Sequence, residues 1–480
     1  MNICIVVIDT LRRDHIGAYG NDRIETPNMD RLAAQSVLFD HCFTHSYPTI
    51  PHRTDVLTGE YGAPFHPWMP LRHERMTFVE ELGQNGYCTQ LIHDTPHLVN
   101  GGHNFDWPFH AWTPIRGAEV DRPWIDHRAE WPANWARDHR FDFADDDVLR
   151  GRMIQTYVRA NRERSAPEQW NCCRLFETAA RFLHDNSKRN NFLLWVDCFD
   201  PHEPWDAPPE FVLKYDDFEG YDGRIDPRSF AVRNREDLPE EAGRHIAAQY
   251  PAKVSWMDHC LGRFLHAMDE TGLADNTAVI LTADHGTNVG ARGSYGKGFP
   301  VREQEARIPL MVRVPGSHPA RSDVIVQPQD IYATVMAIAG EETDKQIESF
   351  DVLQQARNGT PKRDLALAGG RADNWNGETD RTLFTAFTTE WALEFAARPE
   401  HCRLERLGTI EEVSAEHPDV VRKLRAAAID GIERRGADPA LVHWLRRNGE
   451  AEWPSDIPFW DGYPGPAGYT SYFNRIYLGD

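Results

Sequence analysis

Short apolar runs alternate with amphipathic stretches along the first 340 residues of the chain. The apolar runs, each bounded by polar turn residues, predict strands at 3–8, 89–93, 191–197, 277–282 and 310–314. Apolar residues at helical spacing predict helices at 28–35, 77–85, 173–185, 247–270 and 328–339. Continuous apolar strands between helices are typical of sheets covered on both faces, so the pattern favours an α/β fold with a large mixed, mostly parallel sheet sandwiched by helices.

The pattern changes after Gly340. Residues 386–398 and 409–435 indicate a smaller C-terminal α+β subdomain, and 453–480 form a tail rich in Pro, Gly and Tyr. We therefore predict two units, 1–345 and 346–480. Within the first unit, the segments 103–165 and 200–245 are rich in Trp, Pro, Asp and Arg and have weak periodicity, so we expect long excursions over the sheet edge.

The composition limits the partners of such a fold. The 480 residues include 52 Lys and Arg against 74 Asp and Glu, a formal net charge of −22, and so acidic a surface repels polyanions. We expect neither nucleic acid nor a membrane as a partner. The apolar run at 3–8 is too short for a signal segment or a spanning helix, which predicts a cytoplasmic protein. The eight cysteines form no C-x-x-C pair, which argues against a disulfide scaffold.

Polar residues follow the predicted strands where strands of an open parallel sheet meet at one crevice. Asp9 comes directly after the first strand, and Asp284-His285-Gly286 closes the fourth. Carboxylate and imidazole groups at a strand end suit a metal ion, although Asp9 alone is as well explained as a turn cap.

A second cluster contains Thr49 and Arg53. If a helix begins near Pro51, Thr49 stands at its positive N-terminal end, where an anion or alkoxide is stabilised, and Arg53 lies one turn further along to clamp that anion. A plain helix cap is the alternative for Thr49. His202, in Asp200-Pro201-His202, suits a proton donor, and Lys297, between two glycines, suits close contact with an anion; a stiffened loop and a solvated Lys are the alternatives.

These clusters, in this order, resemble the sulfatase branch of the alkaline phosphatase superfamily. The match runs through about residue 345 and consists of Asp9-Thr10-Leu11-Arg12-Arg13-Asp14-His15, Thr26-Pro27-Asn28, Thr49-x-Pro51-x-Arg53 with Leu57-Thr58-Gly59, Asp200-Pro201-His202, Asp284-His285-Gly286 and Gly296-Lys297-Gly298. The resemblance implies an alkaline phosphatase-like catalytic domain at 1–345. It also implies one divalent metal ion held by Asp9, Asp284, His285 and the oxygen of Thr49.

The same resemblance assigns roles to the remaining residues. Thr49 corresponds to the nucleophile, Arg53 to its anion clamp, and His202 and Lys297 to groups that bind the substrate or assist the leaving group. Two carboxylates, one imidazole and one alkoxide form a mixed oxygen and nitrogen set, which favours Mn²⁺ or Zn²⁺ over Ca²⁺ or Mg²⁺.

The departures from the sulfatase pattern bear on the substrate. Sulfatases generally oxidise a Cys or Ser to formylglycine, and Thr49 cannot form that aldehyde, so we expect no formylglycine and cleavage of the covalent ester by water. A second departure is Asp9-Thr10 where many sulfatases have two adjacent aspartates, with Asp284-His285 where many have Asp-Asn, and this combination resembles phosphonate monoester hydrolases and phosphodiesterases. Asp94 falls at or near a Lys that grips sulfate in sulfatases, and His97 is a candidate to compensate, with its register open.

We therefore predict a metal-dependent hydrolase of a small monoanionic ester, a phosphodiester or phosphonate monoester, through a covalent Thr49 intermediate. The alternatives are a sulfate ester hydrolase (sulfatase) that uses unmodified Thr, a phosphotransferase, and a non-catalytic binding protein. The aromatic C-terminal tail, Tyr463 to Tyr477, either packs on its own subdomain or reaches a neighbouring subunit in a homo-oligomer, and the sequence leaves both open.

Overall fold

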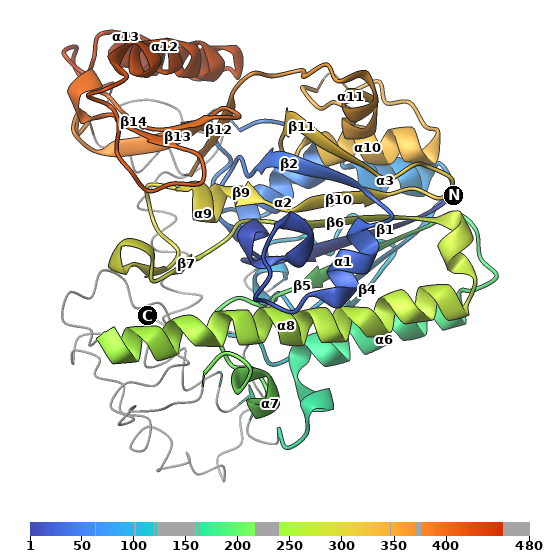
Figure 1. Ribbon diagram of the computed structural model, residues 1–480. Helices are drawn as coiled ribbons and strands as arrows, with labels where there is room; N and C mark the ends of the chain where they lie inside the picture. The colour runs from blue at the N-terminus through green and yellow to red at the C-terminus, as the bar shows by residue number, and fades with distance from the viewer. Residues whose placement is uncertain are drawn as a thin grey trace.

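The computed structural model describes residues 1–62, 64–99, 102–119, 121, 157, 160–161, 164–216, 240–345, 347–370 and 377–454 (Figure 1). Its centre is one large sheet with strands in the order β11-β2-β10-β6-β1-β5-β3-β4, and β9 pairs with β2 at one end. The strands are β1 (Asn2–Ile8), β2 (Val37–Phe43), β3 (Cys88–His93), β4 (Ala111–Pro114), β5 (Phe192–Cys198), β6 (Thr277–Ala283), β9 (Arg307–Ile308), β10 (Leu310–Arg313) and β11 (Ala320–Val326).

The sheet is mixed and mostly parallel, as the apolar pattern predicts. β1 runs parallel to both of its neighbours, β5 and β6, and β3 runs parallel to β4 and β5. β10 is antiparallel to β6 and β2. Every residue of β1, β5 and β6 is buried, because helices cover both faces of the sheet and continuous apolar strands need that cover.

Two layers of helices enclose the sheet (Figure 1). α1 (Pro27–Ala33) and α6 (Asn171–Asp185) pack against the long α8 (Glu240–Glu270) on one face. α2 (Thr49–Thr58) and α3 (Phe78–Gln84) pack against α10 (Asp330–Ala339) on the other. The remaining short elements are α7 (Pro209–Val212), β7 (Asn288–Val289), β8 (Tyr295–Gly296), α9 (Glu303–Ala306) and α11 (Val352–Asn358).

The five predicted strands and five predicted helices are present, with ends that differ by a few residues except that α8 begins earlier, at Glu240. Of the strands in the large sheet, the pattern missed the short β4 and β9 and the longer β2 and β11. Asp40 and His41 interrupt the apolar run of β2, and four of the seven residues of β11 are polar or exposed at its start. Both strands lie toward one edge of the sheet, where partial exposure weakens the hydrophobic signal.

The C-terminal part forms a second, antiparallel sheet, which agrees with the predicted smaller α+β subdomain. Its strands are β12 (Ala366–Gly369), β13 (Thr382–Phe387), β14 (Trp391–Ala396) and β15 (Arg403–Arg406), and α12 (Pro418–Arg434) and α13 (Pro439–Arg446) share an apolar core with it. α11, which precedes β12 in the chain, packs on α10 and β11 of the large sheet. The boundary at residue 345 stays a prediction.

The two sheets meet beside the predicted nucleophile. The backbone N–H of Tyr47 donates to Gly369 O (2.8 Å), and the Gly369 N–H donates to His45 O (3.0 Å). The chain that leads into Thr49 is therefore anchored on β12. Most of the predicted excursions and the tail beyond residue 454 lie outside the described residues. Among the described helices, none has the length and apolar character needed to cross a membrane.

Candidate active site

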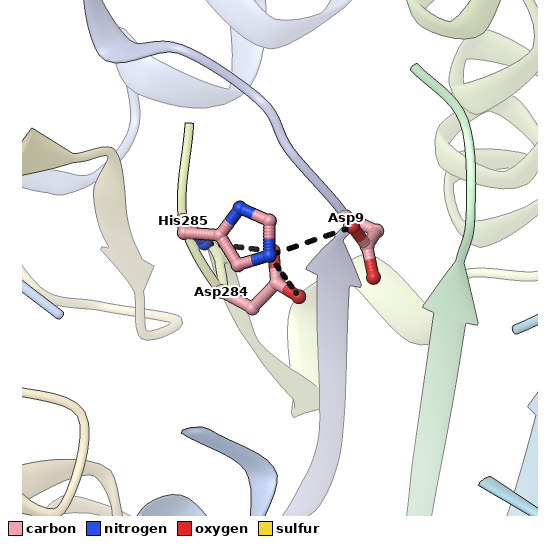
Figure 2. A group of neighbouring side chains, drawn as sticks. All are labelled: Asp9, Asp284 and His285. Carbon is pink, nitrogen blue, oxygen red and sulfur yellow. Dashed lines mark hydrogen bonds and ion pairs between the residues drawn. The ribbon is translucent and has the colours of Figure 1, made fainter. Parts of the chain in front are cut away.

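The metal-ligand candidates lie at the ends of two adjacent strands. β1 and β6 pair in parallel with Ile8 opposite Ala283, so the next residues, Asp9 and Asp284, leave the sheet side by side (Figure 2). His285 follows Asp284 and turns its ring toward the same point. All three side chains are fully buried. The sheet register therefore brings together residues that lie about 275 positions apart in the sequence.

The ligand atoms of these three residues, the metal triad, lie within 4.8 Å of one another. His285 Nε2 is 4.0 Å from Asp9 Oδ1 and 3.6 Å from Asp284 Oδ2. Asp9 Oδ1 and His285 Nε2 are buried and have no hydrogen-bond partner among the described residues, whereas His285 Nδ1 lies 2.8 Å from Gly286 O. A buried polar atom without a partner costs stability, so the triad fits a bound cation that all three atoms would contact.

The electrostatics of the triad agree with this fit. Burial and the charge of Asp284 raise the pKa of Asp9 well above its usual value. Burial also acts to raise the pKa of Asp284, but His285 and Arg53 outweigh it and lower that pKa. Burial lowers the pKa of His285, which keeps the imidazole neutral and its Nε2 available as a ligand. Two buried carboxylates this close repel, and a divalent cation between them removes that repulsion.

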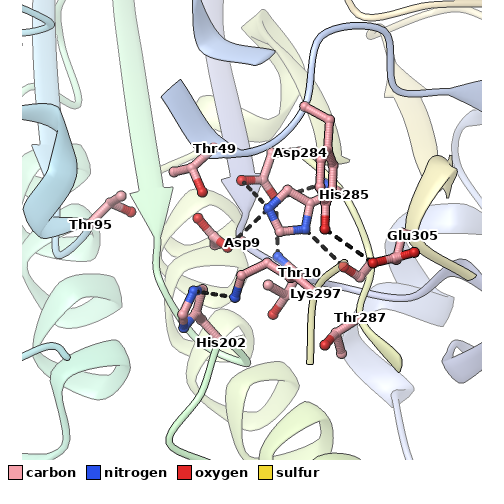
Figure 3. Close-up of polar contacts among 12 residues, drawn as sticks. Asp9, Thr10, Thr49, Thr95, His202, Asp284, His285, Thr287, Lys297 and Glu305 are labelled. Carbon is pink, nitrogen blue, oxygen red and sulfur yellow. Dashed lines mark hydrogen bonds and ion pairs between the residues drawn. The ribbon is translucent and has the colours of Figure 1, made fainter. Parts of the chain in front are cut away.

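Thr49 is the first residue of α2, whose residues are all buried. Pro48 occupies the N-cap position, which removes the plain helix-cap alternative for Thr49. Thr49 is 2% exposed, and Figure 3 shows it beside Asp9 and Asp284 with its hydroxyl on the side that faces them. The positive end of α2 and the metal triad therefore flank the same hydroxyl.

Arg53 differs from the expected anion clamp. Its Nε and Nη2 donate to the two oxygens of Asp197 (2.9 and 2.8 Å), and Nη1 donates to Asp284 Oδ2 (2.6 Å) and to Thr49 O (3.0 Å). Nη2 also reaches Asp9 Oδ2 at 3.4 Å. All five N–H bonds are thus directed at protein acceptors, and in this structure Arg53 positions the carboxylates and the start of α2.

His202 and Lys297 form a hydrogen-bonded pair at the same crevice (Figure 3). Lys297 Nζ donates to His202 Nε2 (2.6 Å) and to Glu203 Oε2 (2.7 Å), while His202 Nδ1 lies 2.7 Å from Glu203 O. Burial and Lys297 lower the pKa of His202 well below its usual value. Burial acts to lower the pKa of Lys297, but Glu203 outweighs it and raises that pKa. Lys297 therefore carries the proton and donates the hydrogen bond, and His202 Nε2 accepts that bond. The proton-donor role expected for His202 would instead require a proton on Nε2.

The glycine before Lys297 has a conformational reason. Gly296 has φ of 75°, in the left-handed region that a side chain disfavours, and its turn directs Lys297 back toward His202. Thr10, the residue after Asp9, has φ of 59°, and its N–H donates to Asp284 Oδ1 (3.0 Å). Thr10 is therefore held in a strained backbone conformation beside the triad.

The two positions left open by the sequence have different environments. Asp94 accepts from Phe199 N (2.6 Å), and burial with the charge of Asp200 raises its pKa well above its usual value. The His97 ring lies near the site, 5.9 Å from the Phe199 ring, which itself stacks on His202 at 4.1 Å. His97 is thus brought to the crevice, whereas Asp94 is not directed into it.

Sequence reasoning missed three carboxyl groups at the site. Asp197 holds Arg53, and Glu203 holds Lys297. Glu119 Oε2 lies 3.8 Å from His202 Nδ1 and 4.0 Å from His97 Nε2, and burial raises the pKa of Glu119 to about 8. A charged residue closing the apolar run at 191–197 was the available signal for Asp197; Glu119 lies in a segment without periodicity.

A mostly parallel sheet whose strand ends carry a buried Asp, Asp and His group beside a helix N-terminus defines the alkaline phosphatase-like class of folds. Residues 1–341 match the family model described as Sulfatase. The chain belongs to the sulfatase family, a family of hydrolases, which confirms the resemblance seen in the motifs.

Relatives of this family include enzymes of different specificities. The chain is 26% identical to iduronate 2-sulfatase of Mus musculus over 355 residues, 66% of this chain and 60% of that protein. It is 26% identical to an arylsulfatase of Clostridium perfringens over 393 residues, 75% of this chain and 79% of that protein. The fold is similar to a phosphonate monoester hydrolase from Silicibacter pomeroyi, with a TM-score of 0.68 and 21% identity over 90% of this chain and 95% of the other. It is also similar to one from Agrobacterium radiobacter, with a TM-score of 0.66 and 18% identity over 90% and 96%.

Proposed function

We propose that this protein hydrolyses a small monoanionic ester, a phosphodiester or phosphonate monoester, through a covalent ester on Thr49. The observation that carries this proposal is the Thr49 hydroxyl at the positive end of α2, beside the metal triad. A threonine cannot be oxidised to the aldehyde that sulfatases use to expel sulfate, so water must cleave the covalent ester at its central atom. Phosphorus esters are cleaved in this way by the related phosphatases and phosphodiesterases.

The chain supplies a group for each part of the reaction. A divalent cation at Asp9, Asp284 and His285, Mn²⁺ or Zn²⁺ by ligand type, would lower the pKa of the Thr49 hydroxyl and withdraw charge from the ester. The Thr49 oxygen forms a bond to phosphorus while the bond to the leaving oxygen breaks. The leaving oxygen takes a proton from the Lys297–His202 pair, and the proton that Thr49 releases passes to solvent. Water then attacks the phosphorus of the Thr49 ester, which still carries the substituent that was not expelled. The hydroxyl of that water stays on phosphorus, its other proton restores the Thr49 hydroxyl, and solvent returns a proton to the Lys297–His202 pair.

The charges around Thr49 favour a monoanion. The charged side chains that contact one another there are two cations and four carboxylates: Arg53, Lys297, Asp9, Asp197, Glu203 and Asp284. A divalent cation brings this group to neutrality, and Glu119 adds no charge while it is protonated. The cost of desolvating an ion grows with the square of its charge, so a neutral buried site admits a singly charged ester far more readily than a dianion.

Thr49→Val tests the nucleophile. We expect turnover of a phenyl phosphodiester to fall by about 10⁴-fold or more, since the attacking atom is lost. Thr54→Val is the matched control, because Thr54 lies on the same helix and its hydroxyl bonds to Ile50 O (3.2 Å) instead of facing the triad. Mass spectrometry of protein quenched during turnover should find on Thr49 the phosphoryl group with the ester substituent that the first step does not expel. Equal rates in the two variants would remove Thr49 from this role.

A sulfate ester hydrolase that uses unmodified Thr49 is the second candidate, and the arylsulfatase of Clostridium perfringens among the relatives favours it. Steady-state kinetics with p-nitrophenyl sulfate, p-nitrophenyl phosphate, its phenyl diester and a phenylphosphonate separate the two. We expect the diester or phosphonate to have the highest kcat/KM. Preference for the sulfate would establish the second candidate, and preference for the phosphate monoester would refute the charge argument.

A further inference from the structure

Asp197 is a fully buried carboxylate near the end of β5, in the centre of the sheet. Four donors meet its two oxygens: Arg53 Nε (2.9 Å), Arg53 Nη2 (2.8 Å), Trp195 Nε1 (3.0 Å) and Thr95 Oγ1 (2.5 Å). Its register places it between Val7 of β1 and His93 of β3. Asp197 is outside the metal triad, yet it accepts a bidentate pair of hydrogen bonds from Arg53. The same guanidinium also contacts Asp9 and Asp284 of the triad.

Glu203 repeats this arrangement at the second cation of the site. Its side chain is 2% exposed, and Oε2 accepts from Lys297 Nζ (2.7 Å) while Oε1 accepts from Thr287 Oγ1 (3.1 Å). Each of the two side-chain cations therefore has its own buried carboxylate in addition to the triad. We call Asp197 and Glu203 the counter-carboxylates.

The counter-carboxylates change what Arg53 and Lys297 offer to an anion. Without Asp197, Arg53 would keep only Asp284 and Asp9 as carboxylate partners, and without Glu203, Lys297 would keep His202. The positive charge beside Thr49 would then be larger by about one unit for each carboxylate lost, and that field would favour a doubly charged ester. Pairing at 2.7–2.9 Å cancels most of this field before it reaches the substrate. It also leaves more of the negative field of Asp9 and Asp284 available to a metal ion.

We propose that Asp197 and Glu203 are specificity-determining positioning residues, which hold the charge of the site near neutrality and thereby select singly charged over doubly charged esters. This inference rests on the proposed function. It assigns the charge preference to two carboxylates that neither bind the metal nor react. Removing either charge should favour the dianion and weaken metal binding, because the unbalanced cation then acts on both.

The test uses Asp197→Asn and Glu203→Gln, each close in shape to the native side chain. We expect the ratio of kcat/KM for p-nitrophenyl phosphate to that for its phenyl diester to rise about tenfold in each variant, as one unit charge near the reacting group implies. Trp195→Phe and Thr287→Val are the matched controls, because each removes a neutral donor to the same carboxylate and no charge. Their ratios should stay at the native value.

Calorimetry gives a readout that does not need turnover. Mn²⁺ should bind about tenfold more weakly to each charge variant, and orthophosphate about tenfold more tightly to the Mn²⁺-loaded variants, with both controls unchanged. The two variants concern different segments, so one that does not fold leaves the other to decide. An equal fall for both substrates, or unchanged Mn²⁺ and orthophosphate affinities, would overturn the inference. Wild-type preference for p-nitrophenyl sulfate would refute only the proposed function, and the calorimetry would still test the counter-carboxylates.

Discussion

Lys253, on α8, holds the loop that carries His202. Its ammonium donates to His202 O (2.8 Å) and Pro204 O (2.7 Å) and pairs with Asp200 Oδ1 at 2.8 Å, and the residue is 3% exposed. Lys253→Met keeps the length and apolar stem of the side chain but removes all three contacts. The structure therefore offers a single change that tests how this loop is held.

The magnitude follows from the group that is left behind. Loss of one partner of a buried ion pair costs about 3–5 kcal/mol, because the remaining charge has no counter-ion. Asp200 is 7% exposed and would be that charge. We expect the free energy of unfolding of Lys253→Met, measured in urea, to fall by about 3–5 kcal/mol. Displacement of His202 should also lower kcat/KM for the diester by about 100-fold, since catalysis is sensitive to shifts near 1 Å.

Two controls separate the buried pair from charge in general. Lys253→Met combined with Asp200→Asn should recover part of the lost stability, because no unpaired charge remains. Lys214→Met breaks the exposed pair with Glu25, whose side chains are 38% and 61% exposed, and should cost about 0–1 kcal/mol. A loss in Lys253→Met no larger than that in Lys214→Met would refute the reasoning.

Three further predictions concern the site. Burial raises the pKa of Glu119 to about 8, so the stability that its proton contributes is complete below pH ~4 and is lost as the pH rises through about 8. In the native protein this group should make the free energy of unfolding in urea decline by roughly 1.4 kcal/mol per pH unit between about pH 5 and 8, and Glu119→Gln should remove that decline. An unchanged dependence of the free energy of unfolding on pH would contradict this. EDTA should lower Tm by leaving Asp9 and Asp284 without a cation. Mn²⁺ at about 100 times its Kd should then raise the free energy of unfolding by about 2.7 kcal/mol. A Mn²⁺-dependent rise in Tm that persists in Asp284→Asn would contradict metal binding by the triad. Thr10→Gly should raise the free energy of unfolding by about 1 kcal/mol, because φ is 59° there, and a loss in the same assay would show that the Thr10 side chain outweighs the strain.

The sequence could predict the parts of the fold whose physics is local. β1, β5 and β6 are continuous apolar runs because both of their faces are covered, and α6 shows its apolar stripe at helical spacing. β2 could not be predicted in the same way, since Asp40 bonds to arginines from distant segments and interrupts the run. The register between β1 and β6 had no local signal either, because pairing depends on a neighbour 275 residues away.

The same distinction between local and long-range information applies to the site. The order of Asp9, Thr49, Asp284 and His285 in the chain resembles the sulfatase family, which residues 1–341 match, and the convergence of strand ends in an open parallel sheet predicts that these residues meet. The sequence does not show which carboxylates pair with Arg53 and Lys297. Whether Arg53 faces a substrate or a carboxylate depends on Asp197, which is 144 residues away and arrives beside it only through the strand order.

The sequence by itself thus determined the class of fold and the family, and it predicted the residues of the metal triad and Thr49 as the nucleophile. The tertiary structure decided how charged that site is. Under the proposed function, an acidic chain of net charge −22 can hold an anion because its carboxylates are paired locally with Arg53, Lys297 and a candidate cation site. Electrostatic energy depends on distances of a few ångströms between groups, and those distances exist only in the folded chain.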